Sequence, residues 1–157
     1  MDQAVLDFVY NHRIEWLNDP TVIFSHLLTP RWLFLAVLAW GLYSRRWSPA
    51  FAVGLGEVTA LVLKWIIDRP RPPEFYQLTQ VVDSGMPSAH TVAIFALAMV
   101  IRKPWAWAFA VASALARMYV GVHWLTDILV GVVIGVAVGA FVSWGSRPRS
   151  GVKVADL

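Results

Sequence analysis

Hydrophobic runs of helical length alternate with short polar breaks along most of this chain. The clearest runs cover residues 49–67, 88–102 and 124–144, and they approach the ~20 residues that a helix needs to cross a bilayer. A shorter run, 104–120, opens with a proline, which is favoured in the first turn of a helix. The pattern predicts that all four runs are transmembrane helices.

Polar residues interrupt the N-terminal third of the chain. Residues 4–17 combine an apolar face with several charges, which predicts an amphipathic helix in the membrane interface, within an N-terminal segment 1–20. The next run, 21–43, is long enough to cross but contains Pro30. Two interpretations remain open: the run crosses as one kinked helix, or only residues 32–44 cross.

Together these runs predict an all-α integral membrane bundle of about five to six transmembrane helices, forming a single domain over residues 1–157. Composition agrees, because 58% of residues are hydrophobic and only 15% are charged, against about 25% in soluble proteins. Glycines near every fourth position permit close helix packing, at Gly121, Gly131, Gly135 and Gly139. The absence of cysteine excludes disulfides and thiolate metal sites.

Basic residues orient the bundle. They gather in the short connections at 45–46 and 102–103 and in the C-terminal tail, 145–157. With five crossings these segments share one side, and excess Lys and Arg predicts that this side is cytoplasmic, in a bacterial plasma membrane. Segments 68–87 and 118–124 then face outward, away from the cytoplasm.

The first outward cluster is "KWIIDRPRPP". Lys64 lies in the last turn of a span, and the prolines after it, including Pro72, end the helix and hold Arg71 in an extended segment. Asp68 and Arg69 are expected to pair with each other at the helix end. Snorkelling to lipid headgroups is the simpler explanation for such cations, but it does not explain positive charge on the outer side.

The second cluster is "MPSAH". Pro87 and Ser88 predict a helix start with Ser88 as the N-cap. The unpaired amides of Ala89 and His90 would then form an anion site, because a helix N-terminus presents several N–H groups to one ligand. Taken alone, His90 is better explained as an interfacial residue without a catalytic role.

The third cluster begins the stretch "RMYVGVHWLTDILVG". His123 and Asp127 are four residues apart, which predicts that they share a helical face. A carboxylate there can accept the imidazole Nδ1–H and leave Nε2 outward as a nucleophile. A structural pair between Arg117 and Asp127 is the competing interpretation, although ionisable groups within membranes are usually functional.

Combined, the clusters bring three cations, one helix N-terminus and two histidines to one membrane face. Cations and amides suit a phosphoryl group, whose charge is spread over three oxygens. Two histidines supply a nucleophile and a proton donor.

These blocks resemble the three signatures of the type-2 phosphatidic acid phosphatase superfamily, membrane lipid phosphatases related to vanadium haloperoxidases. The first signature, Lys, six residues and Arg-Pro, is matched by Lys64, Arg71 and Pro72. The second, Pro-Ser-Gly-His, is matched by Pro87, Ser88 and His90, with Ala89 in place of glycine. The third, Ser-Arg, five residues, His, three residues and Asp, is matched by Arg117, His123 and Asp127, with Ala116 in place of serine.

The resemblance implies a double displacement without metal or cofactor. His123 would form a phosphohistidine, Asp127 would orient it, and His90 would protonate the leaving oxygen. The phosphate would be held by Lys64, Arg71, Ser88, Ala89 and Arg117. Ala89 keeps its backbone amide and Ala116 removes one hydroxyl, so these departures affect substrate fit and rate more than activity itself.

Three further residues are expected to support the site, namely Glu57, Pro72 and Pro87. Glu57 lies seven residues before Lys64, on the same helical face and roughly 10 Å lower. Two roles are open for it: a structural pair within the bundle, or tuning of the Lys64 region.

The expected function is hydrolysis of a lipid phosphate monoester or diphosphate. Candidate substrates are a polyprenyl diphosphate, phosphatidic acid, phosphatidylglycerol phosphate and a polyprenyl sugar phosphate. The alternatives are a phosphotransferase and, more remotely, a small transporter, which would be expected to show repeated halves that this sequence lacks. The expected partners are the bilayer and a lipid phosphate, with no nucleic acid, and the oligomeric state cannot be read from the sequence.

Overall fold

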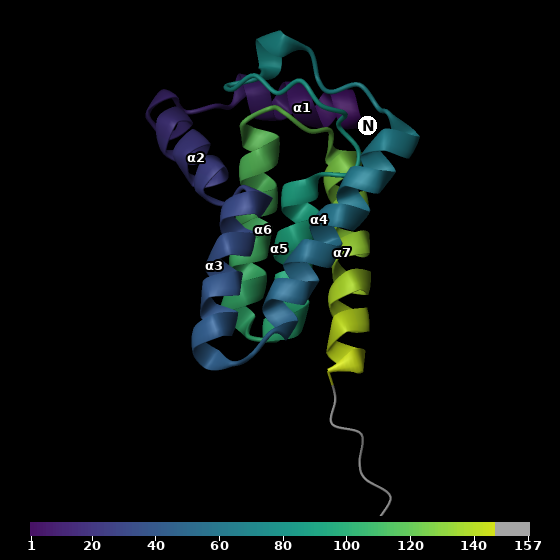
Figure 1. Ribbon diagram of the computed structural model, residues 1–157. Coiled ribbons are helices and arrows are strands. Elements are labelled where there is room, and N and C mark those ends of the chain that lie inside the picture. Colours follow the sequence, from purple (N-terminus) through teal and green to yellow (C-terminus); the bar gives the residue numbers. More distant parts are fainter. Residues whose placement is uncertain (147–157) are drawn as a thin grey trace, which may run out of the picture.

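Seven α-helices and one 3₁₀ helix form the regular structure of residues 1–146, the part of the chain that the computed structural model describes (Figure 1). Their bounds are α1 Asp2–Asn11, α2 Glu15–Leu27, α3 Pro30–Ser44, α4 Ser48–Ile67, η1 Glu74–Tyr76, α5 Ala89–Ile101, α6 Pro104–Tyr119 and α7 Leu125–Gly145. Helices α3 to α7 run along the bundle, whereas α1 lies across one end of it (Figure 1).

The all-α fold and the four clearest predicted helices are confirmed by α4, α5, α6 and α7. By length and hydropathy, α4 and α7 are long and apolar enough to cross a membrane, and the bent pair α2–α3 would make a third span. Helix α5 is apolar but shorter. The expected five to six crossings therefore exceed the two to three spans that these criteria give. The predicted tail, 145–157, lies almost wholly outside the described residues.

The predicted interfacial helix 4–17 is wrong as a single helix, because the chain breaks between α1 and α2. Arg13 lies in this break and donates from Nε to the Tyr119 carbonyl, at 2.9 Å, and from Nη2 to the Tyr76 carbonyl, at 2.6 Å. The amide of Ile14 donates to the Tyr119 hydroxyl, at 3.0 Å. The Tyr119 hydroxyl thus replaces the carbonyl that the Ile14 amide would have bonded in a continuous helix, and Arg13 attaches the break to two distant carbonyls.

The run 21–43 is not one kinked helix. Thr29 is extended, with φ −53° and ψ 134°, as expected for a residue that precedes proline. Pro30 consequently begins a new helix, α3, which contains the predicted short span 32–44. The axes of α2 and α3 differ by 52°, so α2 leans away from the bundle (Figure 1).

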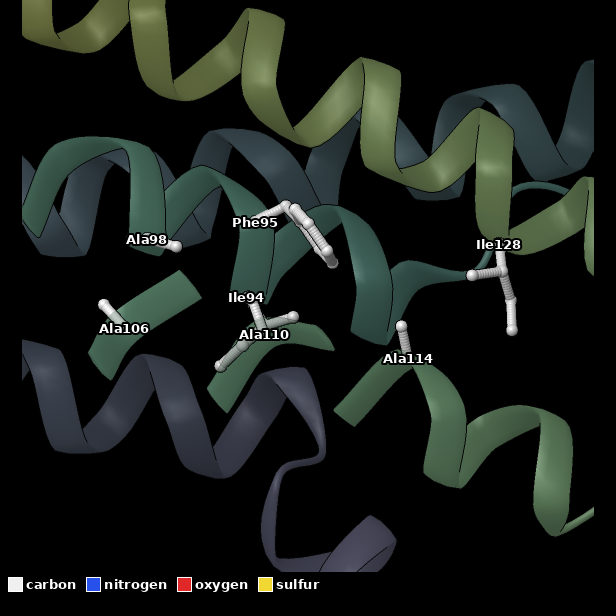
Figure 2. Close-up of a cluster of buried hydrophobic side chains, with 7 residues drawn as sticks. All are labelled: Ile94, Phe95, Ala98, Ala106, Ala110, Ala114 and Ile128. Atoms are coloured by element: carbon white, nitrogen blue, oxygen red, sulfur yellow. The ribbon is translucent and has the colours of Figure 1, made fainter. Parts of the chain in front are cut away.

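Helix α5 lies at the centre of the bundle and packs through small side chains on α6 (Figure 2). Alanines spaced by four residues on α6 present a flat surface to α5, which allows the two helices to approach closely. The cluster consists of Ile94, Phe95, Ala98, Ala106, Ala110, Ala114 and Ile128.

The glycines of α7 bring that helix into backbone contact with α5, as predicted. A Cβ atom at Gly135 would lie 2.6 Å from the Val92 carbonyl oxygen, and one at Gly139 would lie 2.5 Å from the Ala96 carbonyl oxygen. Gly121 does not belong to this row, because it lies in the turn after α6 with φ +78°. The contact fixes the first turn of α5 beside the second and third turns of α7, and the Ser88 amide donates to the Asp127 carbonyl, at 3.1 Å, which joins the starts of the two helices.

Candidate active site

The three predicted clusters meet at the end of the bundle that α1 covers. Helices α4 and α6 end there, and α5 and α7 begin there (Figure 1). A cavity of about 290 Å³ lies between them, and the predicted residues that line it are Glu57, Lys64, Arg71, Ala89, His90, Arg117 and His123. The remaining predicted residues, Pro72, Pro87, Ser88 and Asp127, are fully buried.

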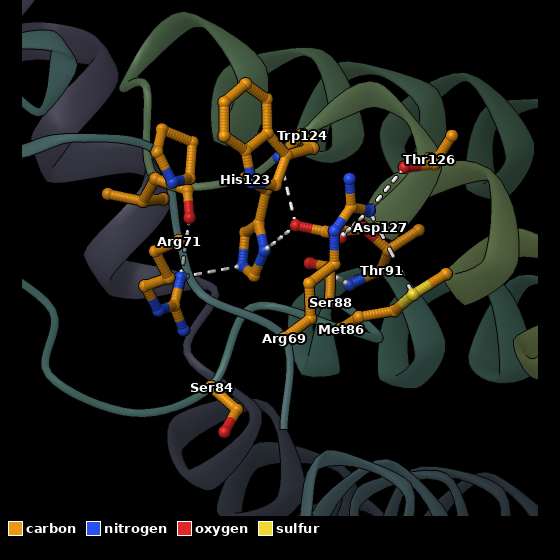
Figure 3. A network of polar contacts seen from close by, with 12 residues as sticks. Arg69, Arg71, Ser84, Met86, Ser88, Thr91, His123, Trp124, Thr126 and Asp127 are labelled. Atoms are coloured by element: carbon orange, nitrogen blue, oxygen red, sulfur yellow. Dashed lines mark hydrogen bonds and ion pairs between the residues drawn. The ribbon is translucent and has the colours of Figure 1, made fainter. Parts of the chain in front are cut away.

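His123 lies between a carboxylate and a cation (Figure 3). Its Nδ1 is 3.4 Å from Oδ2 of Asp127, and its Nε2 is 3.2 Å from Nη1 of Arg71. Because a guanidinium can only donate, Nε2 accepts, and the ring proton therefore lies on Nδ1, toward the carboxylate. The pair does not share a helical face as predicted, since α7 begins two residues after His123.

Asp127 is held in place by donors from two directions (Figure 3). Its Oδ1 accepts from Nη1 of Arg69, at 2.7 Å, and its Oδ2 accepts from the Trp124 amide, at 3.0 Å. Arg69 also pairs with Asp2, at 2.8 Å. The expected pair between Arg69 and Asp68 is therefore wrong, and Asp68 accepts instead from a serine hydroxyl of the following loop.

Asp83, which belongs to none of the three sequence clusters, joins two of the cations. Its Oδ2 lies 2.9 Å from Nζ of Lys64, and its Oδ1 accepts from Nη2 of Arg71, at 2.6 Å. Partial burial alone would raise the pKa of Asp83, but the hydrogen bond from Lys64 and the charge of Arg71 outweigh it and lower that pKa. An ionised carboxylate thus occupies the position that the cations offer to an anion.

Arg117 is buried and donates from Nη1 to the hydroxyl of Ser25 on α2, at 2.6 Å. This hydroxyl comes from a distant helix and contacts the guanidinium, whereas Ala116 offers none. The Nε–H of Arg117 has no acceptor among residues 1–146. The sequence contains no local signal for Ser25, because 92 positions separate it from Arg117.

The predicted helix start after Pro87 is confirmed. Ser88 is the N-cap of α5, and its hydroxyl accepts from the amide of Thr91, at a long 3.5 Å. Within the described part of the chain, the amides of Ala89 and His90 have no acceptor. Nε2 of His90 is buried and likewise has no partner there. The two amides and the His90 ring nitrogen are therefore polar groups without partners at the wall of the cavity.

The electrostatics favour a neutral His123. Burial lowers the pKa of His123 well below its usual 6.5, and the nearby charges of Arg117, Arg71 and Lys64 lower it further. A neutral imidazole keeps its Nε2 lone pair available at neutral and mildly acidic pH.

The described residues contain no group of three or more His, Cys, Asp or Glu side chains arranged to hold a metal ion. The cavity instead offers three side-chain cations and free amides to an anion. A helical membrane bundle with this arrangement beside two histidines is typical of a membrane phosphatase.

The chain belongs to the PAP2 superfamily, whose family model matches residues 45–150. It is 31% identical over 133 residues to the decaprenylphosphoryl-5-phosphoribose phosphatase of Mycobacterium tuberculosis, covering 76% of this chain and 75% of that protein. It is also 30% identical over 100 residues to the undecaprenyl-diphosphatase of Sulfolobus acidocaldarius, covering 56% of this chain and 47% of that protein. The chain is therefore a lipid phosphatase of this family.

Two solved structures have the same fold. The phosphatidylglycerolphosphate phosphatase of Bacillus subtilis superposes with a TM-score of 0.82 at 24% identity, covering 96% of this chain and 87% of that one. LpxE of Aquifex aeolicus superposes with a TM-score of 0.80 at 22% identity, covering 90% of this chain and 93% of that one. The fold is thus a transmembrane PAP2 fold, and the chain is an integral membrane protein.

Proposed function

We propose that this enzyme releases phosphate from a lipid through a phosphohistidine on His123. The observation that carries the proposal is the placement of the His123 ring. Its Nε2 faces the cavity beside Arg71, and its Nδ1 faces the buried carboxylate of Asp127. A nucleophile oriented by a carboxylate, next to cations that bind its target, is the arrangement that covalent phosphoryl transfer needs.

In the first step, Nε2 of His123 attacks phosphorus and the bond from phosphorus to the ester or bridging oxygen breaks. His90 donates a proton to the departing oxygen. Asp127 accepts the Nδ1–H bond and stabilises the positive charge that develops on the ring. The phosphoryl oxygens are held by Lys64, Arg71, Arg117 and the amides of Ala89 and His90.

In the second step, water gives a proton to His90 and attacks phosphorus. The P–N bond breaks, inorganic phosphate leaves, and His123 returns to its neutral form. A phosphotransferase would differ only in using another hydroxyl compound in place of water. No metal takes part, because the built-in cations neutralise the phosphoryl charge.

The substrate is a phosphate monoester or diphosphate on a lipid, as the names of the relatives suggest. The reaction is tested by phosphate release from purified protein with phosphatidic acid, phosphatidylglycerol phosphate and a polyprenyl diphosphate. Activity should persist in EDTA, and vanadate should inhibit by filling the phosphate site. Activity that EDTA abolishes and one divalent ion restores would overturn the mechanism.

The catalytic end of the bundle faces away from the cytoplasm in this proposal, because the basic connections lie at the opposite end. Cysteines introduced at Gln80 and at Ser146 test the orientation. A membrane-impermeant thiol reagent should label the first in intact cells and leave the second unlabelled. The reverse labelling would invert the topology and restrict the enzyme to lipids of the cytoplasmic leaflet.

A further inference from the structure

Glu57 lies near the midpoint of α4 and lines the catalytic cavity. It precedes Lys64 by seven residues, two turns on the same face, so it lies roughly 10 Å further along the helix axis. Its neighbour Gly56 packs against Val92, two residues after His90. The cavity therefore extends from the phosphate-binding cations past His90 into the depth of the bundle.

The carboxylate of Glu57 makes no hydrogen bond or ion pair with any residue of the described range 1–146. Asp83, the other carboxylate in the cavity wall, pairs with Lys64 and Arg71. An acidic side chain in the middle of a membrane span is costly, and such residues usually contact a ligand or a partner. The structural pair considered for Glu57 is therefore absent within this range, which leaves a ligand as its partner.

The α2–α3 break provides the other wall of this deeper part of the cavity, through His26, Thr29 and Pro30. The hydroxyl of Thr29 donates its hydrogen to the His26 carbonyl, at 2.6 Å, so its oxygen remains an acceptor. Glu57 and Thr29 thus offer acceptors to the cavity, and Glu57 lies two helical turns away from the phosphate-binding Lys64. A wall of acceptors favours hydroxyl groups and disfavours a second phosphate.

We propose that Glu57 and Thr29 bind hydroxyl groups of a sugar or small polyol that carries the reacting phosphate. The inference rests on the proposed function, which places that phosphate at His123 and its leaving oxygen at His90. A cavity of about 290 Å³ is at the small end of ligand pockets and suits a headgroup of this size. The enzyme then prefers hydroxylated phosphate monoesters to diphosphates, because a diphosphate lacks the hydroxyls and places charge near Glu57.

The test compares wild-type protein with Glu57→Gln, and uses Glu74→Gln as a matched control at an exposed position of η1. Three lipids are supplied in mixed micelles: phosphatidylglycerol phosphate, which has a glycerol hydroxyl, phosphatidic acid, and a polyprenyl diphosphate. Wild type should have its highest kcat/KM on the first. Glu57→Gln should lower that value by roughly tenfold or more and leave the value for the diphosphate unchanged or raised. Glu74→Gln should behave as wild type.

Equal losses on all three lipids, or a wild-type preference for the diphosphate, would overturn the subsite. Melting of the purified variant gives an independent measurement: Glu57→Gln should melt at or above the wild-type temperature, because an unpaired carboxylate is removed. A marked fall in melting temperature would instead assign Glu57 a structural partner. Failure of the proposed function looks different, because wild type would then release no phosphate from any lipid, or His123→Ala would remain active.

Discussion

The two sides of the His123 ring differ in what they present to it: a fixed carboxylate on one side and an open cavity on the other. Behind the ring, both oxygens of Asp127 accept hydrogen bonds, Arg69 continues the network to Asp2, and Nδ1 of His123 faces Oδ2 at 3.4 Å without a hydrogen bond of its own (Figure 3). In front of it, Nε2 of His90 and Nε of Arg117 are buried without a partner among residues 1–146. Both sides belong to the same end of the same bundle.

This difference distinguishes the residues that position His123 from those that face a bound phosphate in the proposed mechanism. A buried carboxylate whose two oxygens both accept hydrogen bonds is held in one arrangement. Buried polar atoms without partners are uncommon in native proteins, and they point to a group that arrives from outside. In the proposed mechanism, the side that holds Asp127 positions His123, and the side that faces the cavity receives the phosphate.

The largest effect is expected at the ring where the two sides meet. His123→Ala should lower phosphate release by about 10⁴-fold or more, because the nucleophile is lost while the cations remain. The rate is measured with purified protein, and the melting temperature is recorded to show that the variant is folded. His12→Ala, at an exposed position outside the cavity, is the matched control. A folded variant that keeps more than a few per cent of activity would remove His123 from this role.

A substitution behind the ring, at Asp127, should lower the rate less than loss of the ring itself. Asp127→Asn should lower kcat by about 10²- to 10⁴-fold, because the amide no longer stabilises the charged ring although the imidazole remains. Steady-state kinetics on the preferred lipid measure the loss, with the exposed Asp19→Asn as control. A loss as large as that of His123→Ala would contradict the distinction between His123 as nucleophile and Asp127 as the residue that positions it.

Substitution of Arg69 tests whether a residue that contacts Asp127 also helps to position His123. Arg69→Gln should lower kcat by roughly ten- to a hundredfold and leave KM nearly unchanged, because the guanidinium acts through Asp127 and does not line the cavity. Arg69→Lys should recover part of the rate, and the exposed Arg31→Gln should have no effect. A rise in KM with unchanged kcat would place Arg69 on the binding side.

On the front side, Asp83 pairs with Lys64 and Arg71 and is expected to compete with the phosphate for them. Its side chain is 52% exposed, so it can move aside when an anion binds. Asp83→Asn should tighten vanadate inhibition by roughly two- to fivefold, because a neutral amide competes less well for the cations. The vanadate inhibition constant of Asp83→Asn is compared with those of wild type and of the control variant Asp68→Asn. Weaker inhibition would show that Asp83 orients the cations and does not compete.

The smallest effect concerns pH. The pKa of His123 is lowered by burial and then by Arg117, Arg71 and Lys64, so the ring stays neutral below its ordinary value of 6.5. As the pH falls from 7 to 6, kcat at saturating lipid should therefore fall by less than about twofold. A steep acidic limb centred near pH 6.5 would show that the supporting carboxylate outweighs the cations in front.

The sequence predicted the parts of this site that depend on local rules. Ser88 as an N-cap and the glycine contacts of α7 both follow from short-range patterns, and both are confirmed. The spacing of His123 and Asp127 brought the right residues together for the wrong reason, because the ring lies in the connection before α7. Arg69 and Ser25 could not be found, since their partners lie far away in the sequence.

The predicted boundaries of the N-terminal helices were wrong for the same physical reason. Hydrophobic periodicity suggests one helix over 4–17, but the bonds of Arg13 to two distant carbonyls determine where the chain turns. Pro30 was recognised as a break, and its position in the first turn of α3 explains why it starts a helix. Tertiary contacts therefore decide the segments that cover the site, while local rules decide the helices beneath it.

The backbone contact between α5 and α7 has an evolutionary consequence. The glycines of α7 leave no room for a Cβ atom against α5, and His90 is the second residue of α5 while His123 lies two residues before α7 begins. The separation of the proposed proton donor and nucleophile thus depends on main-chain contacts between these two helices, to which α2 and α3 do not contribute. Chimeras that exchange α2 and α3 between relatives should inherit the chemistry of one parent and the lipid preference of the other.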